Sequence, residues 1–491
     1  MRHPAAALIF IHLGCYFTTT AQSFKPEIPR AWEDKAVESF ELPLVHPDRS
    51  PRYLSSREYY ALKEQVIYRS YPAYAPGHEP VGYRDWLKQQ EPQIIFDPAS
   101  LRTKEDWIQA GKIVFQTHLR YSPAPPSPEL DPTLPPLSDG KLHPFRPGNR
   151  YYIRKKGVIE VGLNACADCH TRIMPDGSFL EGAQGIVPRP LGSAVLKQLG
   201  ETGPNAHARR VENEWILFGV PWIQPKDAFI QALTPARVLE QLSANHPGVF
   251  ARQGTSRSHP VHVPSLIGIQ DLRYLDSTGL VRHRSIADLM RYAIVNMGLD
   301  TSAHFGDFQP SSRSTVFGAD DGTRYSDEQL YAMALYLYSL KPPANPNPQD
   351  SLALRGQKVF EQQGCSGCHT PPFYTNNKLT PALGFKVPDS LRKTESILEV
   401  SIGTDSTLAM STRRGTGFYK VPSLRGVWYR NAFGHSGQAE TLEEWLDPAR
   451  LNNDYVPKGF HIGPGPIKGH EFGLKLSPAD KTALIAFLNT L

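Results

Sequence analysis

Cys166-Ala167-Asp168-Cys169-His170 and Cys365-Ser366-Gly367-Cys368-His369 are two copies of the pattern Cys-x-x-Cys-His, one in each half of the chain. In this pattern the two thiols form thioethers with the vinyl groups of a haem, and the following histidine places its imidazole beneath the iron. A redox dithiol needs no such histidine, and one string alone is only half of a zinc site. The strings therefore predict two covalently bound c-type haems. The attachment residues are Cys166, Cys169, Cys365 and Cys368, and the proximal iron ligands are His170 and His369.

The start of the chain predicts where the protein works. A mostly apolar stretch runs from Ala5 to Phe17, and the small residues before Gln22 suit a secretory signal that is cut after Ala21. The stretch is shorter than the roughly 20 residues of a membrane span. We expect residues 1–21 to be a signal peptide and the mature protein to be periplasmic or secreted by a bacterium, with no stable membrane span. Lipoprotein anchoring at Cys15 is a minor alternative, because the residues before it match a lipoprotein signal poorly.

Cysteine use and charge narrow the class further. Loss of Cys15 with the signal leaves four cysteines, all inside the two strings, so no structural disulfide is expected. The 53 Lys and Arg residues exceed the 48 Asp and Glu residues only slightly, and they are scattered along the sequence. Such a balance favours solubility and gives no reason to expect a nucleic-acid partner.

Several segments recur in the same order in both halves of the chain, around the two Cys-x-x-Cys-His strings. The first and last of these segments carry apolar residues at helical spacing, and a serine N-cap begins each of the last pair. The matched pairs are Gly111–Phe115 with Gly356–Phe360, Val263–Leu266 with Val421–Leu424, and Ser326–Leu340 with Ser477–Leu491. We therefore predict a mainly α fold in which two cytochrome c-like helical haem domains are related by an internal repeat.

The repeat and the prolines set the expected boundaries. Phe360 lies five residues before Cys365, whereas Phe115 lies 51 residues before Cys166, so the first domain carries a long insertion. Its prolines exclude helix and central strand, and a segment of this length near a haem is more often functional than idle. The predicted parts are a signal peptide (1–21), an irregular N-terminal extension (22–100), haem domain 1 (101–345, with a Pro-rich insertion at about 120–160) and haem domain 2 (346–491).

The sixth iron ligand distinguishes the two haems. Gly469–Gly473 places His470 just before the final helix, whereas the aligned stretch of the first half, Val316–Asp320, contains neither His nor Met. We expect His470 to close haem 2 as a bis-His electron-transfer centre. Haem 1 is then open or weakly ligated, so that a peroxide or dioxygen can bind there. The rival ligands for haem 2 are Met410, His435 and His461.

Other side chains have weaker claims on the haems. An open iron needs a distal pocket, and the candidates for it at haem 1 are Phe317, Trp222 and Gln184, followed by His304 and Phe305. Core packing is the competing explanation for the apolar candidates, and solvated surface is the competing explanation for Gln184. Arg425 and Arg430 suit haem propionates, because a guanidinium binds carboxylates in a bidentate way. Exposed salt bridges are their alternative role.

The second half of the chain resembles the bacterial di-haem cytochrome c peroxidase superfamily. The motifs that carry the resemblance are Tyr419–Arg425, Phe433–Gly437 and Thr441–Glu444, and the likeness extends more loosely over residues 100–491. The extension, the insertion and the Gly469–Gly473 ending are most similar to the branch that contains the di-haem rubber oxygenase. In that branch the second haem is bis-His, which is what the resemblance implies for His369 and His470.

One departure from the superfamily pattern bears on the reaction. The compact peroxidases have a methionine ligand about fourteen residues beyond the histidine of the Phe-Gly-His-like loop, and here that position is Ala449. This weakens a plain peroxidase assignment, and bis-His ligation also lowers the haem potential relative to His/Met. We expect an oxidoreductase that is a peroxidase or an oxygenase. Its partners would be a small redox protein as electron donor or acceptor, and a peroxide, dioxygen or an organic substrate. The alternatives are a pure electron carrier and a haem-based sensor.

Overall fold

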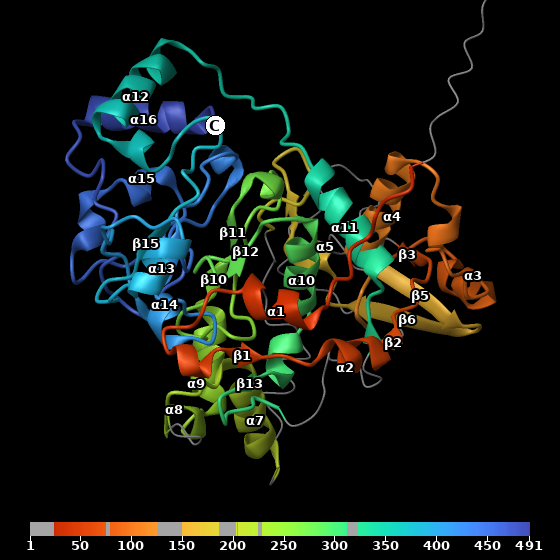
Figure 1. Cartoon of the computed structure of the whole chain (residues 1–491). Helices are drawn as coiled ribbons and strands as arrows, with labels where there is room; N and C mark the ends of the chain where they lie inside the picture. Colours follow the sequence, from red (N-terminus) through yellow and green to blue (C-terminus); the bar gives the residue numbers. More distant parts are fainter. Residues whose placement is uncertain are drawn as a thin grey trace, which may run out of the picture.

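The computed structural model describes residues 24–74, 79–124, 150–185, 203, 205–223, 228–311 and 323–491. The fold is helix-rich, with long loops and short strands between the helices (Figure 1). The predicted signal peptide, most of the Pro-rich stretch and Phe317 lie outside these residues. Within them, every helix is too short or too polar to span a membrane.

The first helical unit is built on a pair of helices far apart in the sequence. Helix α4 (Lys104–Gln116) packs against α11 (Asp327–Ser339), and each begins with a capping box, from Thr103 and Ser326 respectively. The two backbones approach closely where they cross. A Cβ atom on Gly111 would lie 1.9 Å from the carbonyl oxygen of Ala332, so only glycine fits there.

The second helical unit repeats this crossing. Helix α12 (Ser351–Gln362) packs against α16 (Pro478–Asn489), which lie together in Figure 1. A Cβ atom on Gly356 would lie 1.8 Å from the carbonyl oxygen of Ala483. The sequence repeat aligns Gly356 with Gly111, and Ala483 with Ala332. The mainly helical fold and its internal repeat are thus confirmed, down to the glycine at each crossing.

Strands occupy the two ends of the predicted insertion. Strands β3 (Ser70–Pro72), β5 (Arg150–Lys155), β6 (Val158–Leu163) and β4 (Arg120–Pro123) form one antiparallel sheet in that order. Pro123 is accommodated because β4 is an edge strand. The β-branched and aromatic residues of β5 and β6 favour a hairpin, and its inner side chains pack against Tyr71 and Leu87. The insertion therefore does not simply loop out, because its ends add a sheet to the first unit.

The N-terminal extension is more regular than the sequence suggested. It contains α1 (Asp34–Phe40), α2 (Ser56–Ala61) and α3 (Tyr83–Gln89). Two short strands of the extension join the first unit: β1 (Pro51–Arg52) pairs with β13 (His304–Phe305), and β2 (Lys63–Glu64) pairs with β14 (Thr323–Arg324). Trp32 is fully buried, and its indole nitrogen donates a hydrogen bond to the Leu54 carbonyl at 2.9 Å.

The same extension also contacts the second unit. Leu42 packs in a small core with Leu379 and Phe418, and the backbone nitrogen of Val45 donates to the Gly415 carbonyl at 2.9 Å. Because it contacts both units, the extension restrains one relative to the other.

Glu41, in this extension, makes the protein's stability depend on pH. One carboxyl oxygen accepts a hydrogen bond from the Tyr53 hydroxyl at 2.9 Å, and the other is buried without a partner. Burial raises the pKa of Glu41 from 4.5 to about 8. Between pH 4.5 and about 8, the Glu41 carboxyl therefore keeps its proton in the folded state and loses it in the unfolded chain. The contribution of Glu41 to the free energy of unfolding is full below pH 4.5, falls as the pH rises and reaches its minimum above pH 8.

Glu41→Gln is expected to raise the free energy of unfolding by a few kcal/mol at pH 8.5 and to change it little at pH 4.5. Urea unfolding across this pH range measures the effect. Glu38→Gln is the matched control, because Glu38 lies on the exposed surface of α1. Equal pH dependence in Glu41→Gln and the unmodified protein would show that this carboxyl is not the source.

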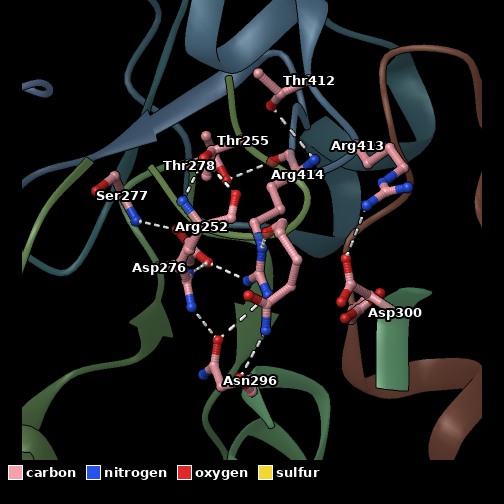
Figure 2. A network of polar contacts seen from close by, with 12 residues as sticks. Arg252, Thr255, Asp276, Ser277, Thr278, Asn296, Asp300, Thr412, Arg413 and Arg414 are labelled. Atoms are coloured by element: carbon pink, nitrogen blue, oxygen red, sulfur yellow. Dashed lines mark hydrogen bonds and ion pairs between the residues drawn. The ribbon is translucent and has the colours of Figure 1, made fainter. Parts of the chain in front are cut away.

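A buried network of arginines and carboxylates also joins the two units (Figure 2). Asp276 lies 2.6 Å from Arg252 and 2.6 Å from Arg414, which comes from the second unit. The adjacent Arg413 lies 3.4 Å from Asp300. Burial acts to raise the pKa of Asp276, but the two guanidiniums outweigh it and lower this pKa to about 2. Asp276 is therefore ionised at neutral pH.

Candidate haem sites

The two proximal histidines are oriented in the same way. His170 Nδ1 lies 3.1 Å from the carbonyl oxygen of Pro264, and the ring of His369 bonds to the carbonyls of Tyr374, at 3.1 Å, and Pro422. Pro264 and Pro422 occupy the same position of the repeated Val-Pro-Ser-Leu segment. Since a carbonyl can only accept, Nδ1 carries the proton in each ring. Nε2 is then unprotonated and free to bind iron.

Both rings are also held in the neutral state that a metal requires. Burial lowers the pKa of His170 to about 4, with a smaller contribution from Arg252. Burial likewise lowers the pKa of His369. Because a protonated imidazole has no lone pair to donate, these shifts favour ligation at neutral pH.

A cavity in the second unit contains the residues predicted for haem 2. It is lined by Cys365, Cys368, His369 and His470, so the two attachment thiols and the two candidate ligands face one space. None of these cysteines forms a disulfide. Most of the wall is apolar, with Phe360, Leu398, Ile402, Leu424, Val427, Leu446 and Leu488 among its side chains. The donor set and the apolar wall fit a haem.

The two histidines of this cavity are spaced for a single iron between them. The ring centroids of His369 and His470 lie 6.3 Å apart, with an angle of 60° between the ring planes. Two metal–imidazole bonds of about 2 Å each, plus about 1 Å from each nitrogen to its ring centre, give a separation of about 6 Å. The observed distance matches this value. Burial, followed by the nearby His369, lowers the pKa of His470 to about 4, so this ring is neutral as well.

Arg450 holds His470 in place. Its side chain is fully buried and donates hydrogen bonds to the carbonyls of Gly469 and His470, both at 2.9 Å, and to that of Ile467. His470 has a φ of 48°, in the left-handed region, and its backbone nitrogen donates to Ile402 at 2.8 Å. Arg450 is thus a positioning residue for His470. No sequence motif marks it, so the sequence did not predict it.

The rival ligands lie in other contacts. Met410 packs against a small core with Leu408 and Ala409. His461 has its Nδ1 2.9 Å from the Gly459 carbonyl and lines a second cavity. The His435 ring stacks on Tyr419 at a centroid distance of 3.5 Å, although it also lines the haem-2 cavity. Of the four candidates, His470 is the one whose ring contact with His369 is observed, at a centroid distance of 6.3 Å.

Two half-buried cations in the same cavity suit haem propionates. Lys420 and Arg430 both line it, and burial lowers the pKa of each, that of Lys420 to about 8. Within the described part of the chain, neither forms an ion pair with a carboxylate inside 4.0 Å. Arg425 also lines the cavity, but it pairs with Asp271 at 2.8 Å, which is the alternative expected from the sequence. Lys420 was not singled out from the sequence.

The distal candidates for haem 1 are not brought together. Trp222 is half-buried, and its ring lies 5.3 Å from that of His46 in the extension. Gln184 is buried and accepts a hydrogen bond from the backbone of Asn431 at 3.3 Å, on the wall of the haem-2 cavity. Phe317 lies outside the described residues. His304 pairs with Arg52 in a short strand, and Phe305 is in the main core.

Polar contacts instead join the first attachment region to the second unit. Arg172, two residues after His170, donates to the Asn431 side chain at 3.1 Å. His262 Nδ1 lies 2.9 Å from the Gly434 carbonyl. Gln184, which accepts from Asn431, is part of the same contact between the first attachment region and the second unit. The backbone nitrogen of the next residue, Gly185, donates to the Cys169 carbonyl at 3.1 Å. The two haem-binding regions therefore adjoin each other directly.

No protein-family model matches the chain, and no curated protein matches it. Among solved structures, a chain of the Kuenenia stuttgartiensis hydrazine synthase is 16% identical at a TM-score of 0.29, covering 62% of this chain and 96% of its own. A MauG-like protein associated with microbial copper homeostasis is 16% identical at 0.30, covering 59% and 89%. A variant of the diheme peroxidase BthA from Burkholderia thailandensis is 17% identical at 0.28, covering 60% and 85%. These scores are too low to assign a function.

Proposed function

We propose that this chain is a periplasmic or secreted di-haem c-type cytochrome and an oxidoreductase. In this proposal haem 1 binds a peroxide or dioxygen, and haem 2 transfers electrons. The observation that supports the proposal is the 6.3 Å separation between the ring centroids of His369 and His470, which line one cavity together with Cys365 and Cys368. When bound, the haems supply one-electron redox chemistry that the side chains lack.

The residues around haem 2 suit electron carriage rather than substrate binding. His369 and His470 would both bind the iron of haem 2, which would leave no site on it for a peroxide. Lys420 and Arg430 would neutralise the propionates in the buried cavity, where unpaired charges are costly. The contact between Gln184 and Asn431 brings the haem-2 cavity next to the first attachment region, so an electron would have a short way to travel between the two haems.

The residues around haem 1 support the second half of the proposal. His170 is oriented as His369 is, so it would hold haem 1 from the proximal side. The aligned stretch that would carry a distal ligand, Val316–Asp320, contains no His or Met. An iron with one protein ligand is open to a small oxygen species.

The finer assignment rests on the resemblance. The motifs of the second half resemble the di-haem cytochrome c peroxidase superfamily, and the Gly469–Gly473 ending resembles its rubber-oxygenase branch. Ala449 stands where the compact peroxidases have a methionine ligand, which weakens a plain peroxidase assignment. A small redox protein would exchange electrons with haem 2, and a peroxide, or dioxygen with an organic substrate, would react at haem 1. A nucleic acid is not among the proposed partners.

Optical and electron paramagnetic resonance spectra of the purified holoprotein test the proposal. Two haems per chain, one low-spin and one high-spin, are expected in the oxidised state. Addition of hydrogen peroxide to the oxidised protein, or of dioxygen to the reduced protein, should change only the high-spin species. If both haems are low-spin and neither spectrum changes with either reagent, the protein is a pure electron carrier and not an enzyme. A spectrum that changes reversibly with the oxygen species, without turnover, would instead indicate a sensor.

A further inference from the structure

A buried tyrosine and histidine lie beside the first attachment motif. The Tyr152 hydroxyl is 2.9 Å from His118 Nδ1, and both side chains are fully buried. On the other side of the imidazole, His118 Nε2 lies 3.5 Å from Oδ1 of Asp168. Asp168 stands between the two attachment cysteines of haem 1 in the sequence. Tyr152, His118 and Asp168 thus form a chain of three polar side chains that leads from the sheet to the haem-1 motif.

The hydrogen bonds show which atom donates and which accepts between Tyr152 and His118. The backbone nitrogen of His118 donates to the Tyr152 oxygen at 3.3 Å, so that oxygen already accepts one bond. The phenol O–H is left to donate to Nδ1. In that tautomer Nε2 carries the imidazole proton and faces the Asp168 carboxylate. The phenol proton therefore has a base within hydrogen-bond distance, and the carboxylate lies where it would stabilise that base once protonated.

The surroundings fix these side chains. Tyr152 lies on β5, and its ring meets that of Tyr121 at a centroid distance of 4.9 Å. Gly162 on β6 gives the imidazole its space, because a Cβ atom there would lie 2.3 Å from the His118 ring. Burial raises the pKa of Tyr152 well above its ordinary value, so the phenol is neutral at rest. A buried phenol can then lose an electron readily only if its proton leaves at the same time.

We propose that Tyr152 is a redox-active tyrosine that supplies an electron to haem 1, with His118 as its proton acceptor. In this step a hydroperoxide would first take two electrons from haem 1 and be reduced to water or an alcohol. Tyr152 would then return one electron to haem 1, and its phenol proton would pass to His118 Nδ1. The O–H bond breaks, an N–H bond forms, haem 1 is reduced by one electron, and a neutral tyrosyl radical remains. The oxidant is a hydroperoxide at haem 1, so the inference rests on the proposed function.

Tyr152 would supply the second of the two electrons that a peroxide needs. Reduction of a peroxide to water takes two electrons, whereas an iron such as that of haem 2 delivers one at a time. An electron held in Tyr152 provides the second equivalent when haem 2 is already oxidised. The Tyr121 ring, next to Tyr152 and under the Arg154 guanidinium at 4.3 Å, is the next aromatic group along the sheet.

The competing explanation is purely structural: the same bonds brace the sheet against the attachment motif. Tyr152→Phe and Tyr151→Phe separate the two roles. Tyr151 is the neighbouring residue on β5, so it points to the opposite face of the sheet, and it is equally buried. Each variant loses one hydroxyl from the same strand, but only Tyr152→Phe removes the group that faces His118. His118→Gln provides an independent third variant that keeps the phenol and removes its base.

The experiment uses the oxidised holoprotein, freeze-quenched after addition of hydrogen peroxide and examined by electron paramagnetic resonance and optical spectroscopy. The unmodified protein and Tyr151→Phe should give a tyrosyl radical signal whose hyperfine splitting collapses when ring-deuterated tyrosine is incorporated. Tyr152→Phe should lose at least nine tenths of that signal, and His118→Gln should lower its yield several-fold. Haem content and the resting optical spectrum should be the same in all four proteins.

The outcomes separate this inference from the proposed function. If the optical spectrum of haem 1 responds to peroxide but the radical is absent, or is unchanged in Tyr152→Phe, the inference is wrong and the proposed function stands. If haem 1 responds neither to peroxide in the oxidised protein nor to dioxygen in the reduced protein, the proposed function fails. Photochemical oxidation by a ruthenium(III) polypyridyl complex then decides the inference. A radical lost in Tyr152→Phe and kept in Tyr151→Phe supports it, and the same signal in both variants overturns it.

Discussion

Replacing His470 with glycine is expected to convert haem 2 from a low-spin to a high-spin centre. His470 is the ring placed 6.3 Å from His369, and its removal leaves the iron with one protein ligand. Iron with a single axial imidazole is high-spin, whereas two imidazoles make it low-spin. Glycine is the appropriate replacement, because position 470 has a φ of 48° and glycine adopts that conformation without strain.

Optical and electron paramagnetic resonance spectra of the oxidised variant measure this change. The low-spin signal of haem 2 should disappear, and free imidazole should restore it by filling the space that the side chain leaves. His461→Ala is the matched control, since His461 lies in the second cavity and should leave the spectrum as it was. A low-spin haem 2 that survives in His470→Gly without added imidazole would show that another residue is the ligand.

The repeat explains why the sequence singles out His470. Once Ser326–Leu340 is aligned with Ser477–Leu491, the segment before each final helix becomes comparable, and only the second contains a histidine. The same alignment places Gly111 and Gly356 at equivalent helix crossings. Features that recur in both halves could thus be recognised in a single sequence, because each half serves as a comparison for the other.

The site residues that the sequence does not reveal either lack a counterpart in the other half of the chain or belong to no motif. Arg450 acts through backbone carbonyls about twenty residues away in the chain, and a single arginine in a loop gives no sign of this. Lys420 lies within a recognised motif, but its charge gains meaning only because burial places it in the cavity. Trp222, predicted as a distal residue of haem 1, has its ring beside that of His46 of the extension, a contact between distant segments that the sequence does not show.

The sheet beside the first unit was missed for a different reason. Prolines make up half of residues 123–136 and predict a loop there, but the β-branched and aromatic residues of β5 and β6 that follow favour strands. The pairing of Tyr152 with His118 depends on that sheet, since 34 residues separate the two in the chain. Contacts of this kind follow from tertiary structure, and no spacing rule predicts them.

Asp276→Asn is expected to destabilise the protein by about 3–5 kcal/mol, because it leaves two buried guanidiniums without their counter-charge. Asp276 Oδ2 is 2.6 Å from both Arg252 and Arg414, and the Asp276 side chain is almost completely buried (Figure 2). An amide of the same shape keeps the packing but supplies only a neutral oxygen. The loss is therefore one of charge, and urea unfolding at pH 7 measures it.

The control for this change is a carboxylate in a similar ion pair with more solvent. Asp271 pairs with Arg425 at 2.8 Å, with about a third of each side chain exposed, so Asp271→Asn should cost at most about 1 kcal/mol. A second variant separates charge from hydrogen bonding: replacing Arg414 with methionine in the Asp276→Asn background removes one of the two stranded cations. That substitution should recover part of the lost stability, since a buried unpaired charge is more costly than an apolar side chain of similar length. If the double variant is instead less stable by the sum of both single changes, the network contributes through its hydrogen bonds and not through its charges.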